Sequence, residues 1–117
     1  MKITEQLKKE IRPFFWVGQN SSASVCLNAG EYLQEIFDAL ADKGFEGSGY
    51  DWESLAMVYL AEKRPDLVEN INFDSEAGMF CVYSETPEAM QDFIRDFKAA
   101  CADRELILDL LSRAEPD

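Results

Sequence analysis

Carboxylates are the side chains of this protein with the greatest capacity for chemistry: it has 23 Asp and Glu residues, 11 Lys and Arg residues and no His. Histidine is the commonest general base and metal ligand, so its absence excludes Ser-His and Cys-His nucleophile pairs. Two carboxylates could still serve a small hydrolase as acid and base. The simpler interpretation is that acids on helix faces are solvated. Asp92 and Asp96 lie four residues apart and repel each other, and a docked basic surface would relieve that repulsion.

Three cysteines, Cys26, Cys81 and Cys101, are the other reactive side chains. They are far apart, odd in number and without a Cys-x-x-Cys spacing, and each lies in an apolar run. This pattern predicts buried free thiols in a reducing compartment, which we expect to be the cytoplasm. Scattered cysteines without histidine do not predict a structural zinc site, and Gly47-Ser48-Gly49 is too short for a dinucleotide fingerprint. We therefore expect no metal and no cofactor.

The charge is unevenly distributed along the chain, with a net value of −12. Residues 31–117 contain 21 acidic and 7 basic side chains, a net of −14, whereas residues 1–12 contain four basic and two acidic ones. Such a field repels nucleic-acid phosphate and anionic lipid and attracts basic proteins, although solubility alone would also account for it. The N-terminus is charged where a signal peptide is apolar, and no run approaches the ~18 apolar residues of a membrane span. We expect neither a nucleic-acid nor a membrane partner.

Residues 46–52 connect two predicted helices and include two glycines, two aromatic residues and two acids. We call this segment the corner, and two interpretations of it remain open. In the structural interpretation, Ser48 or Asp51 caps the following helix and Trp52 anchors that helix in the core. In the functional interpretation, the corner displays Glu46, Tyr50 and Asp51 to a partner, because tyrosine and acids on a rigid turn suit an interface.

The remaining pattern predicts an α+β fold with an antiparallel sheet, formed by a single domain over residues 1–117. Apolar spacing and turn residues give strand, strand, helix, helix, twice over (ββαα-ββαα), so that each of two β-hairpins is followed by two helices. Cys26 and Cys81 fall at similar places in the second strand of each hairpin. The expected elements are a short helix over 3–11, strands over 14–17 and 24–27, a helix capped by Asn28 and ended by Gly44, a helix over 51–63, strands over 70–74 and 79–84, a helix starting at Thr86-Pro87-Glu88, and a last helix carrying Leu106–Leu111.

Two predicted strands, 14–17 and 79–83, are apolar on both faces, whereas a sheet covered on one side shows cleaner alternation. Either helices cover both faces of the sheet, or one face meets a partner. Trp16 is the candidate contact residue in the first of these strands. An acidic protein that self-associates through this strand is a further interpretation, and we expect a monomer or a weak homodimer.

The corner Gly47-Ser48-Gly49-Tyr50-Asp51-Trp52 resembles the glycine-X-glycine-tyrosine-aspartate-tryptophan signature of the immunity protein 51 family of bacterial polymorphic toxin systems. Segments 13–17, 24–32 and 73–80 also resemble that family in the same order, so that the likeness covers about residues 12–115. The resemblance implies a cytoplasmic, non-enzymatic inhibitor that binds and neutralises a toxin made by the same or a competing bacterium. It supplies no established contact residues.

These observations lead to one hypothesis with two alternatives. The chain is an immunity protein that binds a cognate toxin domain, such as a basic nuclease-type effector, by electrostatic steering. The alternatives are a small hydrolase with paired carboxylates and an acidic self-associating protein. The predicted partner-binding residues are Glu46, Tyr50, Asp51, Trp16, Asp92 and Asp96, and no residue is predicted to be catalytic.

Overall fold

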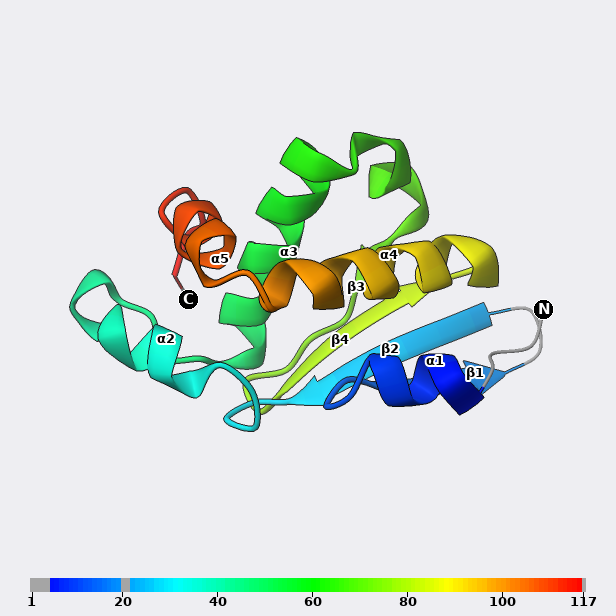
Figure 1. Ribbon diagram of the computed structural model, residues 1–117, viewed down its shortest axis with the longest axis horizontal. Helices are drawn as coiled ribbons and strands as arrows, with labels where there is room; N and C mark the ends of the chain where they lie inside the picture. The colour runs from blue at the N-terminus through cyan, green and yellow to red at the C-terminus, as the bar shows by residue number, and fades with distance from the viewer. Residues whose placement is uncertain (1–4, 20–21, 117) are drawn as a thin grey trace.

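Four antiparallel strands form one sheet; α3 (Gly49–Lys63) and α4 (Pro87–Cys101) pack against it, and α5 (Arg104–Leu111) packs on these two helices (Figure 1). The computed structural model describes residues 5–19 and 22–116. The parts of the predicted domain and of the predicted first helix that fall on residues 1–4, 20, 21 and 117 lie outside the described residues. The elements in chain order are α1 (Glu5–Glu10), β1 (Phe15–Gln19), β2 (Ser22–Asn28), α2 (Gln34–Ala39), the 3-10 helix η1 (Ala41–Lys43), α3 (Gly49–Lys63), the 3-10 helix η2 (Pro65–Asn70), β3 (Asn72–Phe73), β4 (Met79–Ser84), α4 (Pro87–Cys101) and α5 (Arg104–Leu111).

The sheet has the strand order β1-β2-β4-β3, so the second strands of the two predicted hairpins are neighbours at its centre. The predicted α+β class and antiparallel sheet are confirmed. The finer ββαα-ββαα order is not confirmed in that form, because 3-10 helices that were not predicted lie on either side of α3. In the central pair, Val25 lies opposite Val82 and Cys26 lies opposite Cys81.

The predicted start of the second helix is wrong, because the strand before it continues through Asn28. Asn28 pairs with Met79 in the sheet, and the next amide, that of Ala29, donates to the carbonyl oxygen of Gly78 at 3.0 Å. Helix α2 begins only after Leu33, which has a left-handed φ of 55°. A long-range strand pairing therefore prevails over a local capping signal.

An aromatic cluster around Trp52 forms the centre of the core. The Trp52 side chain is 0% exposed, and it comes from the first turn of α3. Its ring centroid lies between 5.4 and 6.2 Å from those of five other rings, mostly in tilted or edge-on arrangements that favour aromatic pairs. These rings, contributed by both the sheet and the helices, belong to Phe14, Tyr32, Phe37, Phe80 and Phe97. The predicted role of Trp52 as the anchor of this helix is confirmed.

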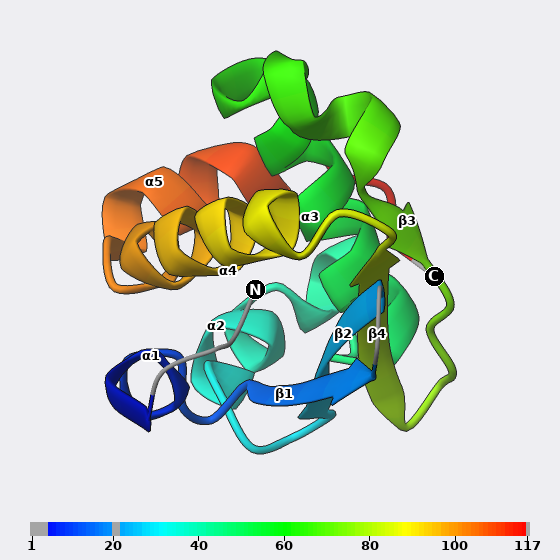
Figure 2. The same ribbon diagram turned by 90° about the vertical axis from the view of Figure 1, so that its right-hand side faces the viewer.

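Helices cover one face of the sheet, and none of the described helices covers the other (Figure 2). Residues that alternate along the two central strands, such as Val25, Leu27 and Phe80, are 0% exposed and face the helices. Their neighbours point the opposite way, onto a surface that we call the open face. Phe15 on β1 and Tyr83 on β4 are respectively 39% and 40% exposed there. The apolar character of both faces thus has two causes, a core on one side and an exposed surface on the other.

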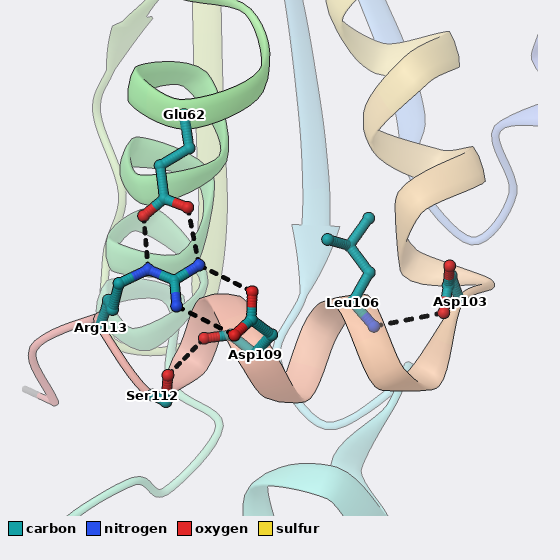
Figure 3. A network of polar contacts seen from close by, with 6 residues as sticks. All are labelled: Glu62, Asp103, Leu106, Asp109, Ser112 and Arg113. Atoms are coloured by element: carbon teal, nitrogen blue, oxygen red, sulfur yellow. Dashed lines mark hydrogen bonds and ion pairs between the residues drawn. The ribbon is translucent and has the colours of Figure 1, made fainter.

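Arg113 joins the ends of α3 and α5 through two carboxylates (Figure 3). Its Nε and Nη2 donate to Glu62 at 2.6 Å each, and its Nη1 and Nη2 donate to Asp109 at 2.9 and 2.8 Å. These hydrogen bonds favour the ionised carboxylates and lower the pKa of Glu62 and of Asp109 from their ordinary values of 4.5 and 3.8. The groups are solvent-exposed, so their net contribution to stability is small.

Lowering the pH should remove this contribution. Because both pKa values are lower in the folded state, the stabilisation is complete above the unfolded-state values and disappears as the pH falls through the folded-state values. At about pH 6 the wild type should be more stable than Arg113→Gln, and the difference in free energy of unfolding should disappear as the pH is lowered to about 2. Urea unfolding across this range measures the difference. Arg104→Gln is the control, and an equal pH response in both variants would refute the assignment.

Candidate functional site

The corner before α3 is organised by the buried carboxylate of Asp51. Its Oδ2 accepts hydrogen bonds from the backbone amides of Glu46 at 2.7 Å, Gly47 at 2.8 Å and Ser48 at 3.3 Å. In return, the Ser48 hydroxyl oxygen accepts from the amide of Asp51 at 3.2 Å, which completes a capping box. Since Asp51 is 0% exposed, its carboxylate serves the fold and does not reach the surface.

Gly49 brings this corner into direct contact with the turn between β3 and β4. Its amide donates to the carbonyl oxygen of Ala77 at 2.9 Å. A Cβ at this position would lie 2.0 Å from the carbonyl oxygen of Glu76 and 2.4 Å from that of Met79, so only glycine fits. Gly47 adds a left-handed φ of 88°. Glycine is therefore required for different reasons at the two positions: close backbone approach at Gly49 and a left-handed φ at Gly47.

Two of the predicted contact residues, Glu46 and Tyr50, belong to this corner and have exposed side chains. Glu46 is exposed and Tyr50 is 40% exposed. Glu46 also borders a shallow polar hollow of about 310 Å³ between the corner, the start of α2 and the β3–β4 turn. The hollow is lined by Ala29, Gly30, Gln34, Glu46, Gly47, Ser48 and Ala77.

The other predicted contact residues lie elsewhere. Trp16 is opposite the fully buried Val25, so it points toward the helices and packs against the core. Asp92 and Asp96 are exposed on α4. The repulsion between them is already reduced within the chain, because the Arg64 guanidinium forms an ion pair with Asp96. The same Arg64 lowers the pKa of Asp66 through a second ion pair at 3.0 Å.

The open face contains exposed residues that are not among the predicted contact residues. Phe15 and Val17 on β1, which flank Trp16, are 39% and 43% exposed, and Tyr83 on β4 is 40% exposed. Met79 is partly exposed on the same side of β4. The two-residue period of a strand was the signal that could have found them, because neighbours of an inward residue must point outward.

Two acids, Asp74 and Glu76, border this open face, and they belong to a part of the chain that is rich in acids, some of which lie on η2 and α4 instead. Residues 65–94, which we call the acidic stretch, contain seven acids and no Lys or Arg; the acids are Asp66, Glu69, Asp74, Glu76, Glu85, Glu88 and Asp92. Asp74 donates its backbone amide to the carbonyl oxygen of Cys81 at 3.0 Å, and Glu76 forms a bridge with Met79. Both acids therefore lie at the edge of the open face, next to the outward residues of β4.

Other kinds of site have less support in the described part of the chain. Within residues 5–19 and 22–116 there is no group of three or more Cys, Asp or Glu arranged to hold a metal ion. Among the same residues, no helix has the length and apolarity that crossing a bilayer requires. The resolved carboxyl pKa shifts, at Glu62, Asp66 and Asp109, are all downward, whereas a general acid requires an upward shift.

Comparison with known proteins gives one clear match. The family model described as Immunity protein 51 matches residues 14–116, which is nearly the whole chain and includes the corner, the open face and the acidic stretch. Neither the curated proteins nor the solved structures contain a match.

Gly49→Ala should destabilise the protein severely. The added Cβ would meet two backbone carbonyl oxygens that cannot move independently, so we expect a loss of about 3 kcal/mol or more in the free energy of unfolding. Gly78→Ala is the matched control in the adjoining turn, because a Cβ there meets nothing within 4 Å. The control should stay within about 0.5 kcal/mol of wild type. Equal losses in chemical denaturation would contradict the close-approach argument.

Asp51→Ala should leave the three amides of the corner without their acceptor. Losing a buried acceptor of several hydrogen bonds predicts a decrease of about 3 kcal/mol in the free energy of unfolding. Asp92→Ala removes an exposed carboxylate and should change stability by about 0.5 kcal/mol or less. Thermal and urea unfolding measure both variants. If Asp51→Ala were as stable as Asp92→Ala, the carboxylate would not organise the corner.

Proposed function

Because the chain belongs to the immunity protein 51 family, we propose that it binds a cognate bacterial toxin domain and neutralises it by forming a complex, without catalysis. The proposed setting is the cytoplasm. The toxin is the only macromolecular partner in this proposal, which includes neither nucleic acid nor membrane. The free protein is a monomer or a weak homodimer.

The observation that carries the proposed mode of binding is the juxtaposition of an uncovered apolar surface with an acidic border. Interfaces combine aromatic and apolar anchors at their centre with a polar rim. The open face supplies such anchors in Phe15 and Tyr83, and Asp74 and Glu76 supply a charged rim. We propose this surface, extended by Glu46 and Tyr50 at the neighbouring corner, as the toxin-binding site.

The charge supports a basic toxin surface as the partner. An acidic rim accelerates association with a basic protein and disfavours acidic competitors. Toxin domains that attack nucleic acid need a basic cleft for phosphate, so a nuclease-type effector fits this chemistry. In that case the acidic rim of Asp74 and Glu76 would occupy the cleft in place of the substrate.

Self-association through β1 remains the second candidate, because Phe15 and Val17 are exposed on an edge strand. Light scattering at high protein concentration separates the two ideas. A monomer excludes self-association as the main role of the open face, whereas a stable dimer that does not dissociate on addition of toxin would exclude the open face as the toxin-binding site.

The direct test is co-expression with the toxin encoded beside this gene. The chain should restore growth to cells that produce the toxin, and the two proteins should co-purify. Absence of both rescue and co-purification would overturn the proposed function.

Charge reversal at the rim should slow binding to the toxin. For Asp74→Lys/Glu76→Lys we expect the association rate constant to fall roughly tenfold at low salt and to become less dependent on ionic strength. Asp42→Lys/Glu115→Lys makes the same change in net charge at two exposed acids elsewhere, so it is the matched control. Stopped-flow or surface-based kinetics measures both. Equal slowing by the two double variants would mean that net charge alone, and not the rim, steers association.

A further inference from the structure

Cys26 and Cys81 come together at the centre of the sheet although they are 55 residues apart in the sequence. They occupy directly opposite positions on β2 and β4, and their sulfur atoms lie 3.2 Å apart. Both are free thiols. The residues that pair around them, such as Val25 with Val82, point to the helices, so the two thiols point to the open face.

The backbone hydrogen bonds identify the type of strand pairing at this position. The Cys81 amide donates to the Ser75 hydroxyl at 3.1 Å, and its carbonyl oxygen accepts from the Asp74 amide at 3.0 Å. Both backbone groups of Cys81 therefore face the β3 side, and Cys26 and Cys81 form a non-hydrogen-bonded pair. In such pairs the Cα atoms are typically about 4.5 Å apart, which lies within the range that disulfides span. Strand pairing alone thus places the two residues where a disulfide can form.

The three cysteines differ in their access to solvent. Cys81 is partly exposed on the open face, and Cys26 beside it is 9% exposed. Cys101, the last residue of α4, is 2% exposed and lies in the core. Burial and the neighbouring Cys81 thiol raise the pKa of Cys26 to about 12, and burial also raises the pKa of Cys101. Because Cys81 is the only one of the three that is not buried, it is the thiol that a dissolved reagent meets first.

We propose that Cys26 and Cys81 are a redox modification site, at which a low-molecular-weight disulfide such as oxidised glutathione converts the two thiols into a reversible cross-strand disulfide. The inference rests on the sheet geometry and does not depend on the proposed binding of a toxin.

The reaction balances as two successive exchanges. The Cys81 thiolate attacks one sulfur of the reagent, the reagent's S–S bond breaks, and the first small thiolate leaves and is protonated. The Cys26 sulfur then loses its proton and attacks the Cys81 sulfur of the mixed disulfide, which releases the second small thiol. Two electrons and two protons pass from the protein to the reagent. The Cys26 sulfur lies beside that of Cys81, so the second exchange is intramolecular.

The test exposes the folded, reduced protein to excess oxidised glutathione, blocks remaining thiols in denaturant and maps peptides by mass spectrometry. We expect a peptide pair that joins Cys26 to Cys81, a mass loss of about 2 Da for the two hydrogens removed, and one blocked thiol at Cys101. Dithiothreitol should restore all three thiols. Because the disulfide closes a loop of some 55 residues, the oxidised protein should also have a higher Tm than the reduced one.

Single variants separate a paired site from ordinary thiol reactivity. Cys26→Ala should retain a stable glutathione adduct on Cys81, since no second thiol can release it. Cys81→Ala should remain largely unmodified while folded, and Cys101→Ala should form the disulfide as the wild type does. If a variant does not fold, the peptide map of the oxidised wild type still shows whether Cys26 and Cys81 are joined. A persistent glutathione adduct without an internal disulfide, three free thiols after exposure, or a disulfide that includes Cys101 would overturn the inference.

Discussion

The position of α3 on the sheet depends on a buried carboxylate and on a close contact between two backbone segments. The Asp51 side chain gathers the amides of the corner before α3, and Gly49 lets that corner touch the β3–β4 turn. Together they fix the first turn of α3, so that the next residue, Trp52, enters the aromatic core between helices and sheet. The motif Gly47–Trp52 therefore connects α3 to the sheet, which explains why these residue types occur at this spacing.

The helices lie on one face of the sheet, and the open face follows from that arrangement. Residues of alternate parity along the same strands have opposite roles: Val25 and Val82 fill the core, while Phe15 and Tyr83 remain in solvent. An exposed apolar surface next to an acidic border is unusual for a protein that acts alone, but it suits one that binds a basic partner. The buried core and the open face thus have the same cause, which is that the helices lie on only one face of the sheet.

Local signals predicted the elements whose causes are local. The capping box at Ser48 and Asp51, the buried stripe that includes Trp52, and the start of α4 at Pro87 all depend on residues within a few positions of one another. The Asn28 cap failed because a distant strand held that residue extended. The sheet order, the uncovered face and the meeting of Cys26 with Cys81 depend on long-range pairing, which no short segment encodes. For the same reason the sequence points to Trp16 as a contact residue, because an apolar strand does not show by itself that Phe15 and Val17 are the residues that face outward.

Hydroxyl-radical footprinting of the chain alone and in complex with its cognate toxin tests the central claim, that the open face is the binding surface. The account predicts that Phe15, Met79 and Tyr83 lose reactivity in the complex. Met57 on α3 and Leu108 on α5, which are 53% and 36% exposed, serve as internal references and should keep theirs. Protection of Met57 or Leu108 with no change at Phe15 and Tyr83 would place the toxin on the helices and contradict the account.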